Sequence, residues 1–254
     1  MLITATEIIQ KSWSTYSQNW KKLLPYIILV FSASAILTLV GFGGVWIESV
    51  VTNNNLIFSN NLLIATLTVA IMLFILWTTI SLTKNLRNLI ENKPMINTKE
   101  SYLQTSKYLW PVIWTSVLVI LAIIFGFVLL FIPALIFAIW FTYSFYIVIF
   151  EDKKGYATLK ESRALVSGRW WKTFWLLLAP TFFFGIIILS IQMVISLPFD
   201  IFLDHKSLAY IFSTSAVSTI VSAIFTPLSA LTTLYLYLSA KENPITTSLP
   251  PTIK

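Results

Sequence analysis

The 254-residue chain contains no cysteine, a single histidine (His205) and only 7 glycines. The absence of cysteine excludes disulfides, thiolate nucleophiles, iron–sulfur clusters and cysteine-ligated zinc. The sequence also has no glycine-rich phosphate-binding loop, no His–Glu metalloprotease motif and no Ser–His–Asp set. We therefore expect a protein that is not an enzyme and that uses no cofactor or metal.

Charged residues are scarce. They make up 11% of the chain, whereas 57% of the residues are hydrophobic and the mean hydropathy is +0.83. Globular domains contain about 25% charged residues. This chain is too apolar to fold in water, and its unit of organisation is the membrane span of about 20 apolar residues.

Six apolar runs approach or exceed the length of a membrane span. The predicted spans are 23–47, 62–83, 109–131, 133–150, 173–197 and 209–239. They predict an all-α fold, a six-transmembrane helix bundle that forms one integral membrane domain over 1–240, followed by a disordered tail at 241–254. A four-span alternative treats 109–150 as one buried hairpin and the first span as a signal, but the lengths of the runs favour six spans.

Three segments outside the spans are typical of amphipathic helices at a membrane surface. They are Thr4–Asn19, Thr98–Tyr108 and part of 151–172, and an aromatic–basic group such as Trp20-Lys21-Lys22 leads from each into a span. This order predicts three repeats of one interfacial helix and two spans. The other explanation is that any entry into a membrane favours Trp and Lys.

Positive charge is distributed unevenly along the chain. Every lysine and arginine except Lys206 falls in the N-terminal segment, the 84–108 loop, the 151–172 loop or the C-terminal tail. Positive short loops mark the cytoplasmic face, so we expect both termini and the amphipathic helices to be cytoplasmic. Topology then explains the net charge of +7, and its spread over four segments argues against nucleic-acid binding.

The 151–172 loop carries the candidate contacts with the membrane surface. Its residues Tyr156, Leu159, Leu165 and Val166 are expected to face the bilayer, and Gly168 to end the helix. The candidate lipid or interface contacts are Arg163, Arg169, Trp170, Trp171 and Lys172. Such basic clusters are attracted to anionic phospholipid. Simple anchoring explains them, and specific recognition of a lipid or a protein partner is the sharper alternative.

The last span carries a stripe of small polar side chains at helical spacing. Its members are Ser215, Ser218, Thr219, Ser222, Thr226, Ser229 and Thr233. Small residues let helices approach closely and hydroxyls bond across them, so close packing is one explanation. The other is a polar groove for a lipid or another amphiphile. No acidic or basic side chain lies within a predicted span, which disfavours ion-driven transport.

Two groups of acids lie at the ends of spans. Asp200 and Asp204 stand beside His205, where metal binding is one use, but a dedicated site needs more rigidly held ligands and a solvated loop is the simpler explanation. Glu151-Asp152 precedes two lysines, and a charged membrane boundary explains it better than acid–base chemistry.

The stretch 130–180 resembles a known family. The matching residues are Ile132-Pro133, Phe141, Tyr143, Phe145, Glu151-Asp152, Leu159, Ser162, Leu165-Val166 and Gly168-Arg169-Trp170-Trp171-Lys172. Here the chain resembles uncharacterised prokaryotic integral membrane proteins, which include YciC-like proteins and the membrane domain fused to some glycerophosphodiester phosphodiesterases. Pro133-Ala134 stands where that family often has Pro-Gly. The resemblance implies a multi-span bundle in the prokaryotic cytoplasmic membrane and no enzyme activity, because the phosphodiesterase chemistry belongs to a separate soluble barrel.

These observations predict a non-enzymatic integral membrane protein that organises the envelope or assists membrane-protein assembly. Its expected contacts are the lipid bilayer and either a membrane-protein partner or a second copy of the chain. The alternative function is binding or transport of a lipid or another amphiphile through a groove lined by the last span.

Overall fold

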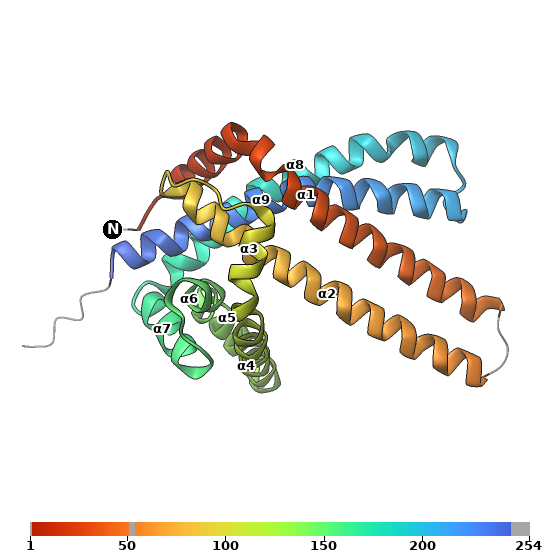
Figure 1. Ribbon diagram of the computed structural model, residues 1–254. Helices are drawn as coiled ribbons and strands as arrows, with labels where there is room; N and C mark the ends of the chain where they lie inside the picture. The colour runs from red at the N-terminus through yellow and green to blue at the C-terminus, as the bar shows by residue number, and fades with distance from the viewer. Residues whose placement is uncertain (1, 51–53, 245–254) are drawn as a thin grey trace, which may run out of the picture. The chain divides into compact units, whose positions relative to one another are not determined.

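A computed structural model describes residues 2–50 and 54–244 (Figure 1). Within these residues the elements are helical, and no β-strand is present. The elements are α1 (Ala5–Val50), α2 (Asn54–Ile90), α3 (Thr98–Thr105), the 3-10 helix η1 (Ser106–Tyr108), α4 (Leu109–Leu129), α5 (Phe131–Trp140), α6 (Ser144–Glu151), α7 (Tyr156–Val166), α8 (Trp170–Phe202) and α9 (Leu208–Glu242).

Six stretches in the described part of the chain are long and apolar enough to cross a membrane. They are Ala5–Gly44, Asn60–Ile90, Thr98–Leu129, Phe131–Glu151, Trp170–Phe202 and Leu208–Glu242. Each predicted span overlaps one of these stretches. The expected fold class, an all-α polytopic helix bundle, is confirmed.

The expected boundary before the first span is absent. The helix α1 is continuous over 46 residues, so the prediction of a separate surface helix at Thr4–Asn19 is wrong. The group Trp20-Lys21-Lys22 remains helical because tryptophan and lysine do not break a helix. Pro25 lies inside α1, and a membrane helix tolerates proline where neighbouring groups satisfy the freed carbonyl.

The fourth predicted span is interrupted. Helix α5 ends at Trp140, a turn covers residues 141–143, and α6 begins at Ser144. Ser144 donates its backbone N–H to the carbonyl oxygen of Phe141 (3.0 Å) instead of to that of Trp140. The turn therefore removes the helical partners of two backbone groups, the Trp140 carbonyl and the Tyr143 N–H.

Two compact units make up the fold. The first comprises Met1–Ser14, Lys107–Thr181 and Leu231–Lys254, and the second comprises Thr15–Ser106 and Phe182–Ala230. The expectation of one membrane domain over 1–240 stays a prediction. The tail expected at 241–254 lies outside the described residues from position 245 onward, and α9 remains helical as far as Glu242.

A buried polar network joins α1, α2 and α3 in the second unit. The Asn85 side chain donates to the Tyr26 hydroxyl (2.6 Å) and the Ile96 carbonyl oxygen (3.2 Å), and it accepts from the Ile96 N–H (2.8 Å). The Ser81 hydroxyl bonds those of Tyr26 (3.1 Å) and Ser101 (2.7 Å). Asn85, Ser81 and Ser101 are completely buried, so the network is dry protein interior.

The short helix expected at Thr98–Tyr108 is present as α3 followed by η1, packed against α2. The Trp77 indole donates to the Tyr102 carbonyl oxygen (3.1 Å), and the Tyr102 hydroxyl bonds that of Thr78 (2.6 Å). The order of elements matches two of the three expected repeats, because α3 precedes α4 and the α5–α6 pair, and α7 precedes α8 and α9. The first repeat differs because its short helix is fused into α1.

Candidate functional site: a tryptophan groove beside a charge cluster

Helix α7 packs on α4, α5 and α6 within the first unit (Figure 1). Its buried residues are Thr158, Leu159, Ser162, Leu165 and Val166. The expectation that Leu159, Leu165 and Val166 face the bilayer is wrong, because protein covers them. Tyr156 is 76% exposed. Amphipathic spacing identifies an apolar face of a helix but does not distinguish a protein neighbour from a lipid one.

Ser162 of α7 occupies the break between α5 and α6. Its hydroxyl donates to the Trp140 carbonyl oxygen (2.7 Å) and accepts from the Tyr143 N–H (3.1 Å), the two groups that the turn deprives of helical partners. Gly155, just before α7, donates its N–H to the Thr115 hydroxyl of α4 (3.0 Å). These hydrogen bonds fix α7 against the α4–α5 hairpin and satisfy buried backbone groups.

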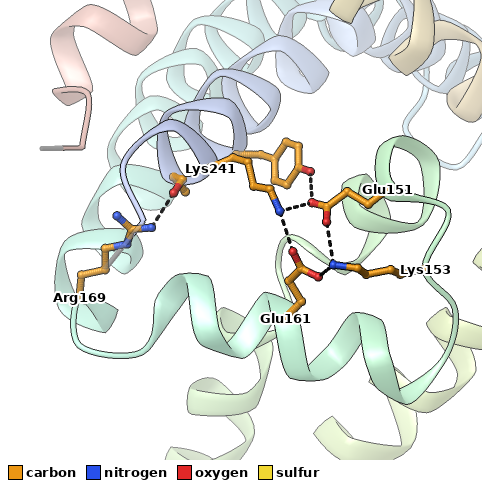
Figure 2. A network of polar contacts seen from close by, with 7 residues as sticks. Glu151, Lys153, Glu161, Arg169 and Lys241 are labelled. Atoms are coloured by element: carbon orange, nitrogen blue, oxygen red, sulfur yellow. Dashed lines mark hydrogen bonds and ion pairs between the residues drawn. The ribbon is translucent and has the colours of Figure 1, made fainter. Parts of the chain in front are cut away.

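Four alternating charges join α6, α7 and α9, and we refer to Glu151, Lys153, Glu161 and Lys241 as the charge cluster (Figure 2). Glu151 accepts hydrogen bonds from Lys241 (2.8 Å), Lys153 (3.1 Å) and the Tyr237 hydroxyl (2.8 Å). Glu161 accepts from Lys241 (2.6 Å) and Lys153. The hydrogen bond to Glu161 raises the pKa of Lys153, and partial burial opposes that rise. Each lysine bridges both carboxylates, so the cluster is internally balanced.

Arg169 connects the end of α7 to the end of α9 (Figure 2). Its Nε donates to the Leu165 carbonyl oxygen (2.7 Å), and its two terminal nitrogens donate to the carbonyl oxygens of Asn243 (2.7 Å) and Ala240 (2.9 Å). Helix C-termini present unpaired carbonyl groups and favour cations. The sequence predicted a lipid contact for Arg169, whereas the structure places its guanidinium on protein carbonyls.

An apolar groove of about 610 Å³ lies between α5 and the start of α8, and we refer to it as the tryptophan groove. One wall consists of Ile132, Leu135, Ile136 and Trp140, and the other of Ser167, Gly168, Trp170 and Trp171. The α5 residues recur at three- and four-residue spacing and therefore share one face of the helix.

The aromatic walls of the groove are held in place. The Trp170 indole donates to the Ile136 carbonyl oxygen (3.4 Å), and its ring stacks on Phe174 with centroids 5.6 Å apart. The Arg163 guanidinium lies 4.3 Å from the centroid of the Trp140 ring, a cation–π contact. Trp171 is 68% exposed. The groove thus combines ordered aromatic walls with a cation against one of them.

The groove contains or adjoins most of the expected membrane-surface contacts. Trp170 and Trp171 line it, Arg163 covers the lining residue Trp140, and Lys172 is exposed in the first turn of α8. Binding of lipid to these residues stays a prediction. Sequence reasoning missed the α5 wall, although the spacing from Ile132 to Trp140 marks one helix face. It also missed Tyr237 and Lys241 as partners of Glu151, because they lie far along the chain.

Two threonines of the polar stripe of α9 bond to their own helix. The Thr219 hydroxyl donates to the Ser215 carbonyl oxygen (2.8 Å), and the Thr226 hydroxyl donates to that of Ser222 (2.9 Å). Thr219 also lines a largely apolar cavity of about 200 Å³ with residues of α1 and α9. Ser218 and Ser229 are exposed and Thr233 is half-buried. Close packing and a polar groove both stay predictions for this stripe.

The loop between α8 and α9 is held by an aromatic contact. The Tyr210 hydroxyl donates to Asp200 (2.7 Å), and its ring packs edge-on against His205 with centroids 4.6 Å apart. Across residues 2–50 and 54–244, no three His, Asp or Glu side chains gather closely enough to hold a metal ion.

The six apolar helical stretches define a polytopic α-helical membrane protein. A family model described as a domain of unknown function, DUF7847, matches residues 100–239, more than half of the chain. The chain belongs to this family. The matched region contains the tryptophan groove and all of the charge cluster except Lys241. No curated protein and no solved structure matches the chain.

Proposed function

We propose that this protein is a non-enzymatic integral membrane protein that binds a membrane lipid in the tryptophan groove. The observation that carries the proposal is the groove itself, about 610 Å³ between α5 and α8 with tryptophan on both walls. Small-molecule sites are typically apolar cavities of about 300–1,000 Å³ with a few polar groups. Tryptophan is enriched at the membrane–water interface, so the tryptophan walls suit a site for the part of a lipid next to its headgroup.

The charged groups of the first unit support a binding role over a catalytic one. The carboxylates of Glu151 and Glu161 are occupied by lysines, and Glu151 also accepts from Tyr237. The Arg169 guanidinium is occupied by carbonyl oxygens. These groups hold helices together, so the groove is left as the feature that suits a ligand.

The proposed location is the prokaryotic cytoplasmic membrane, with both termini on the cytoplasmic side. The support is the concentration of lysine and arginine in the N-terminal segment, the 84–108 and 151–172 loops and the tail. The resemblance of 130–180 to YciC-like membrane proteins agrees with this location and remains part of the proposal. The end of the groove at Trp140 then lies toward the cytoplasmic side, because it adjoins the basic 151–172 loop.

The test is native mass spectrometry of protein extracted in mild detergent. Wild-type protein is expected to retain lipid at a fixed stoichiometry, and Leu135→Trp, which fills the groove from α5, is expected to lose it. Leu121→Trp is the matched control because Leu121 is 56% exposed on α4 and does not line the groove. Equal lipid retention by wild type and Leu135→Trp would contradict the proposal.

A second candidate function is organisation of the envelope or assembly of membrane proteins. The specific observation is Tyr156, an aromatic residue 76% exposed at the start of α7, with exposed Lys160 one turn later. Aromatic residues are enriched at protein–protein interfaces relative to the rest of the surface. A photo-crosslinking residue at position 156 should then capture one protein, either a partner or a second copy, and capture of lipid alone would favour the first function.

A further inference from the structure

We propose that the ligand of the tryptophan groove is an anionic phospholipid, with one acyl chain in the groove and its phosphate held by Arg163 and Lys172. This inference rests on the proposed function and adds the class of lipid and its orientation. It follows from three features of the first unit: the position of the two cations, the pairing of the nearby acids, and the direction in which the groove runs.

One cation, Arg163, lies against a wall of the groove, and a second, Lys172, follows a lining residue in the sequence. The Arg163 guanidinium lies 4.3 Å from the ring centroid of Trp140, and that ring lines the groove. Lys172 follows the lining residue Trp171 in the first turn of α8, and both cations are exposed. In the described part of the chain, neither Arg163 nor Lys172 forms an ion pair with an acid.

The acids closest in sequence do not cancel these charges. Glu161, two residues before Arg163, is bridged by Lys153 and Lys241, and Glu151 is bridged by the same lysines. Because Glu151 and Glu161 are already paired with lysines of the charge cluster, they do not neutralise Arg163 and Lys172. The positive charges of Arg163 and Lys172 can therefore attract a bound headgroup. A site with two unbalanced cations favours a lipid that carries net negative charge over a zwitterionic one.

The two ends of the groove also differ in polarity. Its α5 wall extends from Trp140, beside the charged α7, to Ile132, eight residues away, or about 12 Å at 1.5 Å per residue. Ile132 is 66% exposed, and the side chains around it are apolar. The polar end therefore lies at Trp140 and Arg163 and the apolar end at Ile132, which is the polarity of a phospholipid that lies along α5.

The arginine suits a phosphate better than a lysine would at the same place. Its planar guanidinium donates several hydrogen bonds in a fixed geometry, and stacking on an aromatic ring leaves its edge available for an oxyanion. The cation–π contact with Trp140 thus orients Arg163 before the lipid arrives. Lys172 supplies a second, more mobile positive charge from α8.

The experiment compares the affinities of purified protein in detergent micelles for phosphatidylglycerol and phosphatidylcholine by titration in native mass spectrometry. Wild-type protein is expected to bind phosphatidylglycerol at least tenfold more tightly. The variant Arg163→Gln/Lys172→Gln should lose about fivefold per cation, the factor for roughly 1 kcal/mol each, while its affinity for phosphatidylcholine changes little. The control Lys22→Gln/Lys99→Gln removes two exposed charges that do not line the groove.

Two outcomes separate this inference from the proposed function. If Arg163→Gln/Lys172→Gln keeps the wild-type preference while Leu135→Trp loses both lipids, the groove binds lipid and the assignment of an anionic headgroup is wrong. If Leu135→Trp keeps both affinities, lipid binding in the groove is itself wrong. A loss of preference that is equal in Lys22→Gln/Lys99→Gln would mean that net charge, and not this site, selects the lipid.

Discussion

The hydroxyl oxygen of Ser162 lies 2.7 Å from the carbonyl oxygen of Trp140, where α5 ends. A single side chain on one helix thus completes the hydrogen bonding of a break in another helix. In an apolar setting an unsatisfied backbone group is costly, so broken helices occur where protein or water satisfies them. The break between α5 and α6 and the position of α7 therefore depend on each other.

Replacement of Ser162 by alanine is expected to destabilise the first unit by about 1–3 kcal/mol, because the partly buried Trp140 carbonyl and the buried Tyr143 N–H lose their partner. The measurement is the midpoint of heat-induced loss of the monodisperse peak in detergent. Ser106→Ala is the control, since Ser106 is exposed and bonds within its own turn. An unchanged midpoint for Ser162→Ala would show that the break is stable without α7.

Replacement of Arg169 by lysine is expected to free the end of α9. Lysine keeps the charge but cannot reach three carbonyl oxygens with fixed geometry, and hydrogen bonds to a charged group contribute about 1.5–3 kcal/mol. Hydrogen exchange over residues 236–244 should therefore accelerate. Lys160→Gln, on the exposed side of α7, should leave that exchange rate unchanged. Equal protection in Arg169→Lys and wild type would contradict the role of Arg169 as a clamp.

The charge cluster is expected to respond to an exchange of its signs. Glu161→Lys and Lys241→Glu each place like charges together and should lower the unfolding midpoint. The double variant restores the attraction between positions 161 and 241 but places like charges against Lys153 and Glu151, so its loss should be smaller than the sum of the two single losses. Coupling energies between groups in such networks are about 0.5–3 kcal/mol. Additive losses in the double variant would show that Glu161 and Lys241 do not interact in the folded protein.

The pH dependence of the cluster has a definite sign. Because the hydrogen bond to Glu161 raises the pKa of Lys153, the contribution of Lys153 to stability is present below the unfolded-state pKa of about 10.4. It is lost as the pH rises through the higher folded-state pKa. The difference in unfolding midpoint between wild type and Lys153→Gln should therefore shrink above about pH 10. If the midpoint difference between wild type and Lys153→Gln stays constant up to alkaline unfolding, Lys153 does not stabilise the cluster through its charge.

The proposed orientation is tested by labelling with a membrane-impermeant thiol reagent. The chain has no cysteine, so single-cysteine variants give an unambiguous signal. A cysteine at Ser207, between α8 and α9, should react in intact cells, and a cysteine at Lys93, between α2 and α3, should react only after the membrane is opened. Labelling of Lys93→Cys in intact cells would reverse the proposed topology.

Sequence reasoning predicted the apolar architecture well because the signal for a span is local. Runs such as 62–83 and 173–197 are long enough to be recognised without knowledge of their neighbours. The short helix at Thr98–Tyr108 was also recognisable, from its place before an aromatic–basic entry. Composition and periodicity within one segment were sufficient in these cases.

The remaining features depend on contacts between distant segments. The turn at 141–143 contains no glycine or proline, and Ser162 stabilises it from another helix. The apolar face of α7 was visible in its periodicity, but only the structure shows that α4, α5 and α6 cover it. In the sequence alone, Arg169 could not be distinguished from other basic residues at a membrane surface. Its acceptors at Ala240 and Asn243 lie about seventy positions later in the chain.

The contacts of Arg169 have an evolutionary consequence. Its acceptors at 165, 240 and 243 are main-chain carbonyl oxygens, so the interaction constrains where those peptide groups lie and not which side chains they carry. Substitutions at these positions that preserve the helix ends are compatible with the clamp. Homologous chains can therefore differ in sequence at these positions and still retain the arginine. We expect no correlated substitutions between position 169 and its acceptor positions.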